Sequence, residues 1–137
     1  MQGLGLFTME ELIWGDLSQH KWTKPGALFT RGPGTYKIPS FNDVPLDMRV
    51  ELLSNAPNPR AIYSSKAVGE PPLFLGAAVF FALKNACMAY REQQGFQGYF
   101  QLNSPATVER LRMACTDEFT ERACENNHDT FQARGSF

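Results

Sequence analysis

The chain has 137 residues, of which 43% are hydrophobic and 20% are charged, and its formal net charge is −1. This composition permits the core of one domain and argues against a disordered chain. Basic residues are scattered singly, which argues against binding along a nucleic-acid backbone. The sequence opens with Met1-Gln2-Gly3 and no basic, apolar leader, so we expect a soluble protein of the cytoplasm.

Helical spacing of Leu6, Met9 and Ile13 predicts a short opening helix. The segment that follows, residues 15–45, is rich in Gly, Pro, Asp and Ser, and we expect it to be a loop. Such a long loop is unusual in a compact domain unless it is functional or packed by other segments.

Apolar residues alternate with charged ones over residues 48–52, a pattern typical of a strand. Residues 61–63 offer a short second strand. Two strands do not form a stable sheet alone, so the segment needs partners.

Pro71 and Pro72 suit the first turn of a helix, where backbone N–H groups lack intrahelical partners. Residues 73–83 are apolar on every side, which predicts a helix buried in a large protein. The helix should reach about Gln93, a length of about 34 Å at 1.5 Å per residue. The apolar run itself is shorter than the ~20 residues that cross a bilayer, so we expect no membrane span.

A last helix is expected to begin near Ser104-Pro105 or Thr107. Val108, Leu111, Cys115 and Phe119 follow at helical spacing and are predicted to form its buried stripe.

The three cysteines, Cys87, Cys115 and Cys124, form no CxxC or CxxxC pair. Their number and spacing argue against a disulfide framework, a zinc site or an iron–sulfur cluster. We interpret Cys87 and Cys115 as small core residues and predict no metal ligand in the chain.

Glu70 precedes the two prolines and is a candidate general base at the rim of the apolar helix. Two other interpretations are open: a helix-start acid favoured by the helix dipole, or an ion pair with Lys66. Because two N–H groups are absent from the first turn, Glu70 has less backbone to cap and can face outward.

The sequence around Glu70 resembles the signature of the xanthine dehydrogenases, which are molybdenum hydroxylases, and three other segments resemble the same family in order. The four segments are 64–76 (SSKAVGEPPLFLG), 2–8 (QGLGLFT), 30–39 (TRGPGTYKIP) and 103–115 (NSPAT, then RMAC). The resemblance implies an α+β fragment of the molybdenum-cofactor-binding domain, with one long buried helix, two shorter helices and a few short strands. Residues 1–122 would form the C-terminal part of that domain, and 123–137 would be a polar tail.

The resemblance also implies the site. Glu70 would be the catalytic general base, and Gln2 and Gly3 would bind the molybdenum–molybdopterin cofactor together with a preceding part of a longer chain. Gly3 and Gly5 would let the backbone approach the cofactor; the half-fingerprint Gly3-Leu4-Gly5 is a weak signal for NAD binding.

The parent enzyme would oxidise hypoxanthine and xanthine to urate, passing electrons through [2Fe-2S] clusters and FAD to NAD or oxygen. It would be a cytoplasmic homodimer, with the peroxisome as the alternative compartment. The chain alone is expected to be inactive.

Two alternatives follow from the same residues. An aldehyde oxidase fragment would share Gly69-Glu70 but usually lacks the double proline. A truncated, non-catalytic product is the other alternative, supported by the missing domains. The sequence departs from the family pattern over residues 14–29, which are longer than expected.

Overall fold

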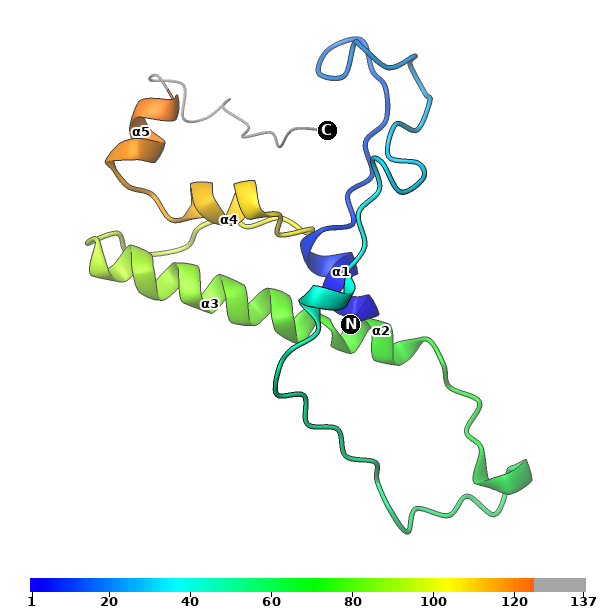
Figure 1. The fold of residues 1–137 in the computed structure, drawn as a ribbon. Helices are drawn as coiled ribbons and strands as arrows, with labels where there is room; N and C mark the ends of the chain where they lie inside the picture. Colours follow the sequence, from blue (N-terminus) through cyan, green and yellow to red (C-terminus); the bar gives the residue numbers. More distant parts are fainter. Residues whose placement is uncertain (125–137) are drawn as a thin grey trace.

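Helices and irregular segments make up the computed structural model, which describes residues 1–124 (Figure 1). The α-helices are α1 (Gln2–Thr8), α2 (Pro71–Leu75), α3 (Ala77–Gln93), α4 (Val108–Ala114) and α5 (Glu118–Cys124), and the 3₁₀ helices are η1 (Phe41–Asp43) and η2 (Ile62–Ser64). Of the expected polar tail, residues 125–137 lie outside the described part.

The predicted strands are not confirmed within residues 1–124. Residues 48–52 have no regular secondary structure, and η2 occupies the place of the second strand. A strand needs a neighbour for its backbone N–H and C=O groups, and the described residues contain only one isolated bridge, between Trp14 and Leu28. Among residues 1–124, the helices of the predicted α+β class therefore form and the strands do not.

The opening helix forms but ends at Thr8, earlier than the spacing of its apolar residues predicted. Ile13 belongs instead to the loop, where its N–H donates to Thr30 Oγ1 at 3.0 Å and its carbonyl accepts from Phe29 N at 2.9 Å. The predicted loop over residues 15–45 is confirmed, apart from the single turn of η1.

The predicted helix from Pro71 to Gln93 is confirmed, with one step at Gly76 that separates α2 from α3. Gly76 has φ −58° and ψ −15°, values near those of a 3₁₀ helix. Its carbonyl accepts from the N–H of Val79, three residues on, at 3.1 Å. The two helices therefore continue in nearly one direction (Figure 1).

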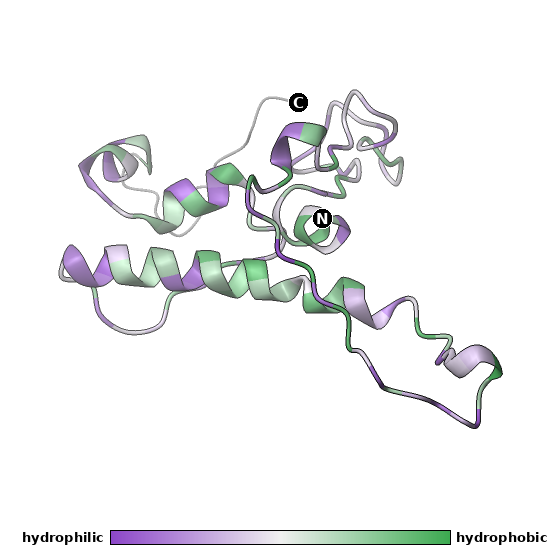
Figure 2. Cartoon of the chain, turned by 60° about the horizontal axis from the view of Figure 1, so that its bottom comes forward, coloured by the Kyte–Doolittle hydropathy of each residue, from purple (hydrophilic) through white to green (hydrophobic). Residues whose placement is uncertain are grey.

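Most of α2 and α3 is exposed in this chain, and only Ala77 and Cys87 are buried. Hydrophobic residues predominate along α2 and the adjoining part of α3 (Figure 2), and Phe74, Leu75 and Phe81 among them are exposed. The accessible surface of the chain is 11030 Å², against roughly 7,200 Å² for a compact protein of this mass. Residues 1–124 thus do not bury this helix as the sequence predicted.

Pro71–Gln93, taken as one helix of 23 residues, is long and apolar enough to cross a membrane by length and composition. The core helix of a soluble protein passes the same test. The helix is longer than the apolar run of residues 73–83, so length no longer argues against a membrane span.

The predicted last helix is divided in two, and its single buried stripe is wrong. Val108 and Phe119 are 80% and 63% exposed. Between α4 and α5, Cys115 has φ −85° and ψ 72°, which ends the first helix. The predicted start is right: Thr107 is the N-cap of α4, and its Oγ1 accepts from Arg110 N at 3.4 Å.

Asp117 explains the division, because its side chain starts a new helix. Its Oδ1 accepts the N–H groups of Phe119 at 3.0 Å and Thr120 at 2.9 Å. The Thr120 N–H and, next, the Arg112 guanidinium hold the pKa of Asp117 below its usual value. This local side-chain bonding competes with a continuous helix.

Candidate active site

Two glycines bring α1 against the junction of α2 and α3. A Cβ atom placed on Gly3 would lie 2.6 Å from the Leu73 carbonyl oxygen and 2.9 Å from the Gly76 Cα. A Cβ atom on Gly76 would lie 2.6 Å from the Gly3 Cα. Because real Cβ atoms do not approach so closely, both positions require glycine, and the two backbones touch.

Aromatic packing supports the same crossing. The ring of Phe7 on α1 lies 6.1 Å from that of Phe74 and 6.4 Å from that of Phe80, measured between centroids. The Phe7–Phe74 pair is edge-to-face, an arrangement that adds about 0.5–1.5 kcal/mol beyond burial. Contacts between aromatic rings therefore stabilise the crossing of α1 with α2 and α3, in addition to the glycine contact.

Glu70 is the residue that directly precedes α2, and its carboxylate caps nothing. The first helical N–H with a partner belongs to Leu73, which donates to the carbonyl oxygen of Glu70, at 2.9 Å. Among residues 1–124 the Glu70 carboxylate has no hydrogen bond and no ion pair, so the pairing with Lys66 does not form. The side chain is exposed and forms no cap.

Gln2 reaches the same part of the molecule from the other end of the described chain. It is the first residue of α1, it is exposed, and it adjoins Gly3. Gly3 contacts the carbonyl of Leu73, which lies one helical turn, about 5 Å, beyond Glu70. Figure 1 shows the N-terminus and α1 beside α2. The crossing thus gathers the three predicted site residues, Gln2, Gly3 and Glu70, at one corner.

The space at Gly3 is taken by backbone rather than left open. Gly3 makes a close backbone approach to the α2–α3 junction. Its approach to a cofactor stays a prediction. At Gly5, the corresponding neighbours are Pro39 and Glu10. The side of Gly3 where a Cβ atom would lie is therefore filled by the chain itself. A cofactor would contact Gly3 from another side, through its backbone atoms.

The described residues contain no group of three or more His, Cys, Asp or Glu side chains that could hold a metal ion. A metal at this corner would need its ligands from a cofactor or from another segment.

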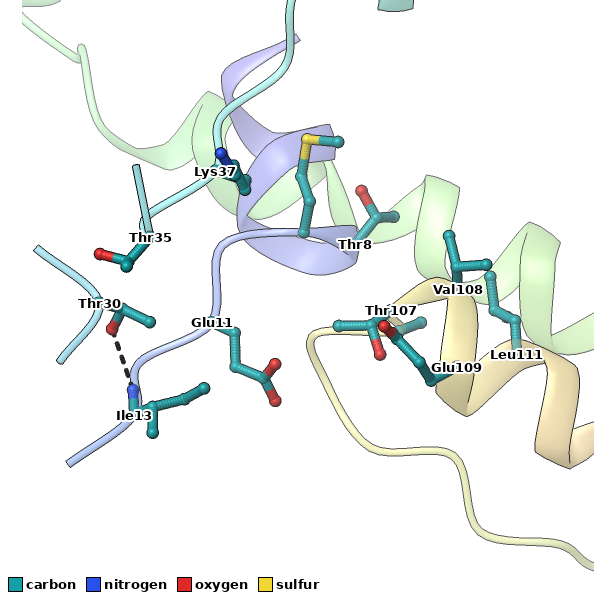
Figure 3. Close-up of a pocket in the computed structure, with 12 residues that line it drawn as sticks. Thr8, Glu11, Ile13, Thr30, Thr35, Lys37, Thr107, Val108, Glu109 and Leu111 are labelled. Atoms are coloured by element: carbon teal, nitrogen blue, oxygen red, sulfur yellow. Dashed lines mark hydrogen bonds between the residues drawn. The ribbon is translucent and has the colours of Figure 1, made fainter. Parts of the chain in front are cut away.

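A pocket of about 350 Å³ lies elsewhere, between the end of α1, the loop and α4 (Figure 3). It is lined by three separate segments, namely residues 8–13, 30–37 and 106–111. None of the predicted site residues lines it. Its Glu11 carboxylate is bound by Arg110, and its Lys37 Nζ donates to Pro33 O at 3.2 Å. No local pattern in the sequence indicates this pocket, because the segments that line it are far apart in the chain.

Comparison with known proteins identifies the class of domain to which the start of the chain is similar. Residues 1–45, which include α1, match the family described as a molybdopterin cofactor-binding domain. The matched range contains Gln2 and Gly3 and ends before Glu70.

The particular relatives are xanthine dehydrogenases. The chain is 58% identical to the xanthine dehydrogenase of Oryza sativa subsp. japonica over 122 residues, which is 89% of this chain and 9% of that protein. It is 59% identical to xanthine dehydrogenase 1 of Arabidopsis thaliana over 120 residues, 88% of this chain and 9% of that protein. With the xanthine dehydrogenase/oxidase of Gallus gallus the identity is 52% over 132 residues, 96% and 9% of the two chains.

These matches confirm the resemblance found in the sequence. The chain matches part of a xanthine dehydrogenase, an oxidoreductase with a molybdopterin cofactor-binding domain. It spans about 9% of the length of these relatives.

Proposed function

We propose that this chain is the C-terminal part of the molybdopterin-binding domain of a molybdenum hydroxylase that oxidises purines, converting hypoxanthine and xanthine to urate. Its contributions are Glu70 as the general base, and Gln2 and Gly3 as part of the cofactor pocket. Molybdenum–molybdopterin is the resident cofactor, and FAD and [2Fe-2S] clusters belong to other parts of the enzyme.

The observation that carries the proposal is the corner formed by α1 and α2. Residues 2 and 70 are far apart in the chain, yet the Gly3–Gly76 contact brings their segments together. Both side chains are exposed and, among residues 1–124, neither has a hydrogen-bonding partner. Exposed polar groups without a partner in the chain are available to a ligand.

Glu70 suits a general base for two reasons. Its carboxylate is not occupied by a cap or an ion pair, so both oxygens can accept a proton or a hydrogen bond. The two prolines after it remove the N–H groups that would otherwise compete for it. Glu70 would accept the proton of the hydroxyl group that attacks the purine.

Gln2 and Gly3 would orient the cofactor. The Gln2 amide offers two donors and one acceptor to polar groups of a pterin, and the helix α1 that carries it is anchored at Gly3. When bound, the cofactor supplies the redox chemistry that these residues lack. The residues of the chain bind, orient and accept a proton.

The substrate and acceptors are inferred from the relatives, whose names specify xanthine dehydrogenase or xanthine dehydrogenase/oxidase. We propose a purine as substrate and NAD or oxygen as electron acceptor. We further propose that the whole enzyme is a cytoplasmic homodimer, and that its remaining parts cover the exposed apolar surface of α2 and α3.

The test is the substitution Glu70→Gln in the full-length enzyme that carries this sequence. The amide keeps the shape of the side chain but accepts no proton, so kcat on xanthine should fall by ~10²–10⁴-fold. Molybdenum content should stay unchanged. The matched control is Glu92→Gln, an exposed glutamate in the last turn of α3, which should leave kcat within twofold.

A Glu70→Gln enzyme within tenfold of the parent would remove Glu70 from the base role. A parent enzyme that turns over aldehydes but not xanthine would instead favour the aldehyde oxidase alternative. A protein that carries no molybdenum would favour a non-catalytic product.

A further inference from the structure

Two of the three cysteines lie side by side, although they are far apart in the sequence. Cys87 is in the middle of α3, and Cys115 directly follows α4. The Cys115 Sγ donates to the Cys87 Sγ across 3.8 Å. The sulfurs need to approach by less than 2 Å to reach the ~2.05 Å of an S–S bond.

Arg91, one turn beyond Cys87, fixes this arrangement. Its Nη1 donates to the carbonyl of Ala114 at 3.0 Å and to Thr116 Oγ1 at 2.9 Å, so it grips the residues on both sides of Cys115. The guanidinium also lies 5.3 Å from the ring centroid of Phe96 and 5.0 Å from that of Phe100. The segment that carries Cys115 is therefore held against α3 by a charged clamp.

The two thiols differ in access. Cys87 is only 5% exposed, whereas Cys115 is partly exposed. Burial, and next the contact with Cys115, raise the pKa of the Cys87 thiol to about 11. An oxidant from solution therefore reaches Cys115 first, and Cys87 is placed behind it as the second thiol.

We propose that Cys87 and Cys115 form a redox-active pair, which hydrogen peroxide oxidises to a disulfide within the chain. The peroxide first converts the Cys115 thiol to a sulfenic acid and leaves as water. The Cys87 sulfur then attacks the Cys115 sulfur; the S–S bond forms, the S–O bond breaks, and hydroxide leaves with the Cys87 proton as a second water. The sulfurs lose two electrons in total and the peroxide gains two. A thiol reductant reverses the step.

The disulfide would join the middle of α3 to the start of the α4–α5 connection, at the place that Arg91 already holds. This inference does not depend on the proposed function, because it uses neither Glu70 nor a cofactor. A transient disulfide of this kind is typical of redox sensing in reducing compartments.

The sequence makes the test direct, because trypsin separates the three cysteines. Cleavage after Lys84, Arg91, Arg112 and Arg122 places Cys87 in peptide 85–91, Cys115 in 113–122 and Cys124 in a peptide that begins at residue 123. The full-length protein is treated with hydrogen peroxide, alkylated, digested and analysed by mass spectrometry without reduction. Peptides 85–91 and 113–122 should appear joined and lighter by two hydrogen atoms, and their alkylated forms should fall at least tenfold.

Cys124 is the internal control. It is also buried, and its alkylated peptide should change less than twofold. The Cys124→Ser variant should give the same joined peptide, whereas Cys115→Ser should abolish it and leave Cys87 available to alkylation after unfolding. The proposal is overturned if both peptides stay alkylated after peroxide treatment, if Cys115 instead pairs with Cys124, or if oxidation ends at a sulfinic acid.

Discussion

The two ends of the α2–α3 helix are built in opposite ways. At the start, Glu70 is exposed, and its carboxylate has no partner among residues 1–124. At the far end, Arg91 binds a carbonyl, a hydroxyl and two aromatic rings of its own chain. The charge at one end is left unpaired among these residues, and the charge at the other end helps to hold α4 in place.

Under the proposed function, this contrast places catalysis at one end of the helix and stability at the other. Changes at the Arg91 end should alter the local free energy of unfolding and leave kcat largely intact. Changes at the Glu70 end should do the reverse. Every prediction below concerns the full-length protein, and hydrogen exchange measures local opening without requiring two-state unfolding.

The largest effect on local stability is expected from Arg91→Gln. The substitution removes a cation that hydrogen-bonds to α4 and its connection, an interaction worth about 1.5–3 kcal/mol. Amide hydrogen exchange in α4 should accelerate about 10- to 100-fold, while kcat stays within twofold. Arg49→Gln is the control, because the Arg49 side chain is 86% exposed in its ion pair and should contribute almost nothing. Unchanged exchange in α4 would show that the clamp is not energetically important.

A comparable effect, at the point where the two regions meet, is expected from Gly76→Ala. Helix propensity alone would make alanine stabilising by about 0.5–1 kcal/mol. The clash with the Gly3 backbone should reverse the sign and destabilise the α1 contact by about 1–3 kcal/mol. Faster hydrogen exchange in α1, together with a lower kcat, would support this. Gly34→Ala has open space around its Cβ and serves as the control; equal behaviour of the two variants would refute the crossing.

A smaller effect is expected when Pro71-Pro72 is replaced by Ser-Gly. The Glu70 carboxylate could then cap the new N–H groups, and such caps are worth about 1 kcal/mol. Glu70 would then turn partly away from the substrate, and kcat on purines should fall about fivefold. Small aldehydes need less orientation and should lose less. Equal losses on both substrates would disconnect the prolines from substrate choice, and no loss would leave them a helix-start device.

The smallest effect is expected from Gln2→Ala. One neutral hydrogen bond contributes about 0.5–1 kcal/mol, so cofactor retention or kcat should fall about two- to fivefold. The side chain is exposed, so hydrogen exchange in α1 should not change. Molybdenum content and steady-state kinetics measure the effect. If neither changes, Gln2 has no part in the site.

The sequence predicted those elements that depend on local signals. Two prolines marked the start of α2, and Thr107 marked the cap of α4. The division at Cys115 was missed, because the hydrophobic spacing continued through it while Asp117 and Thr120 formed a competing cap. Apolar and charged residues do alternate over residues 48–52, but a strand also needs a neighbouring strand, which residues 1–124 do not provide.

The family resemblance predicts the site residues, whereas their arrangement depends on contacts between distant segments. No local pattern indicates that Gly3 touches Gly76, or that Arg91 reaches Ala114 and Thr116. Counting the cysteines argued against a disulfide framework, but counting does not show which sulfurs are neighbours. Cys87 and Cys115 became a pair only through the packing of α3 and α4.

The glycine contact also sets an order of events during synthesis. Gly76, the residue that Gly3 packs against, is made 73 positions after it. At usual translation speeds the ribosome needs about 4–15 s to cover that distance. During this interval α1 lacks its contact with α2 and α3, and Phe7 lacks the rings of Phe74 and Phe80. A nascent chain halted before residue 76 should therefore remain a substrate for chaperones, and one released beyond α3 should not present α1 to them.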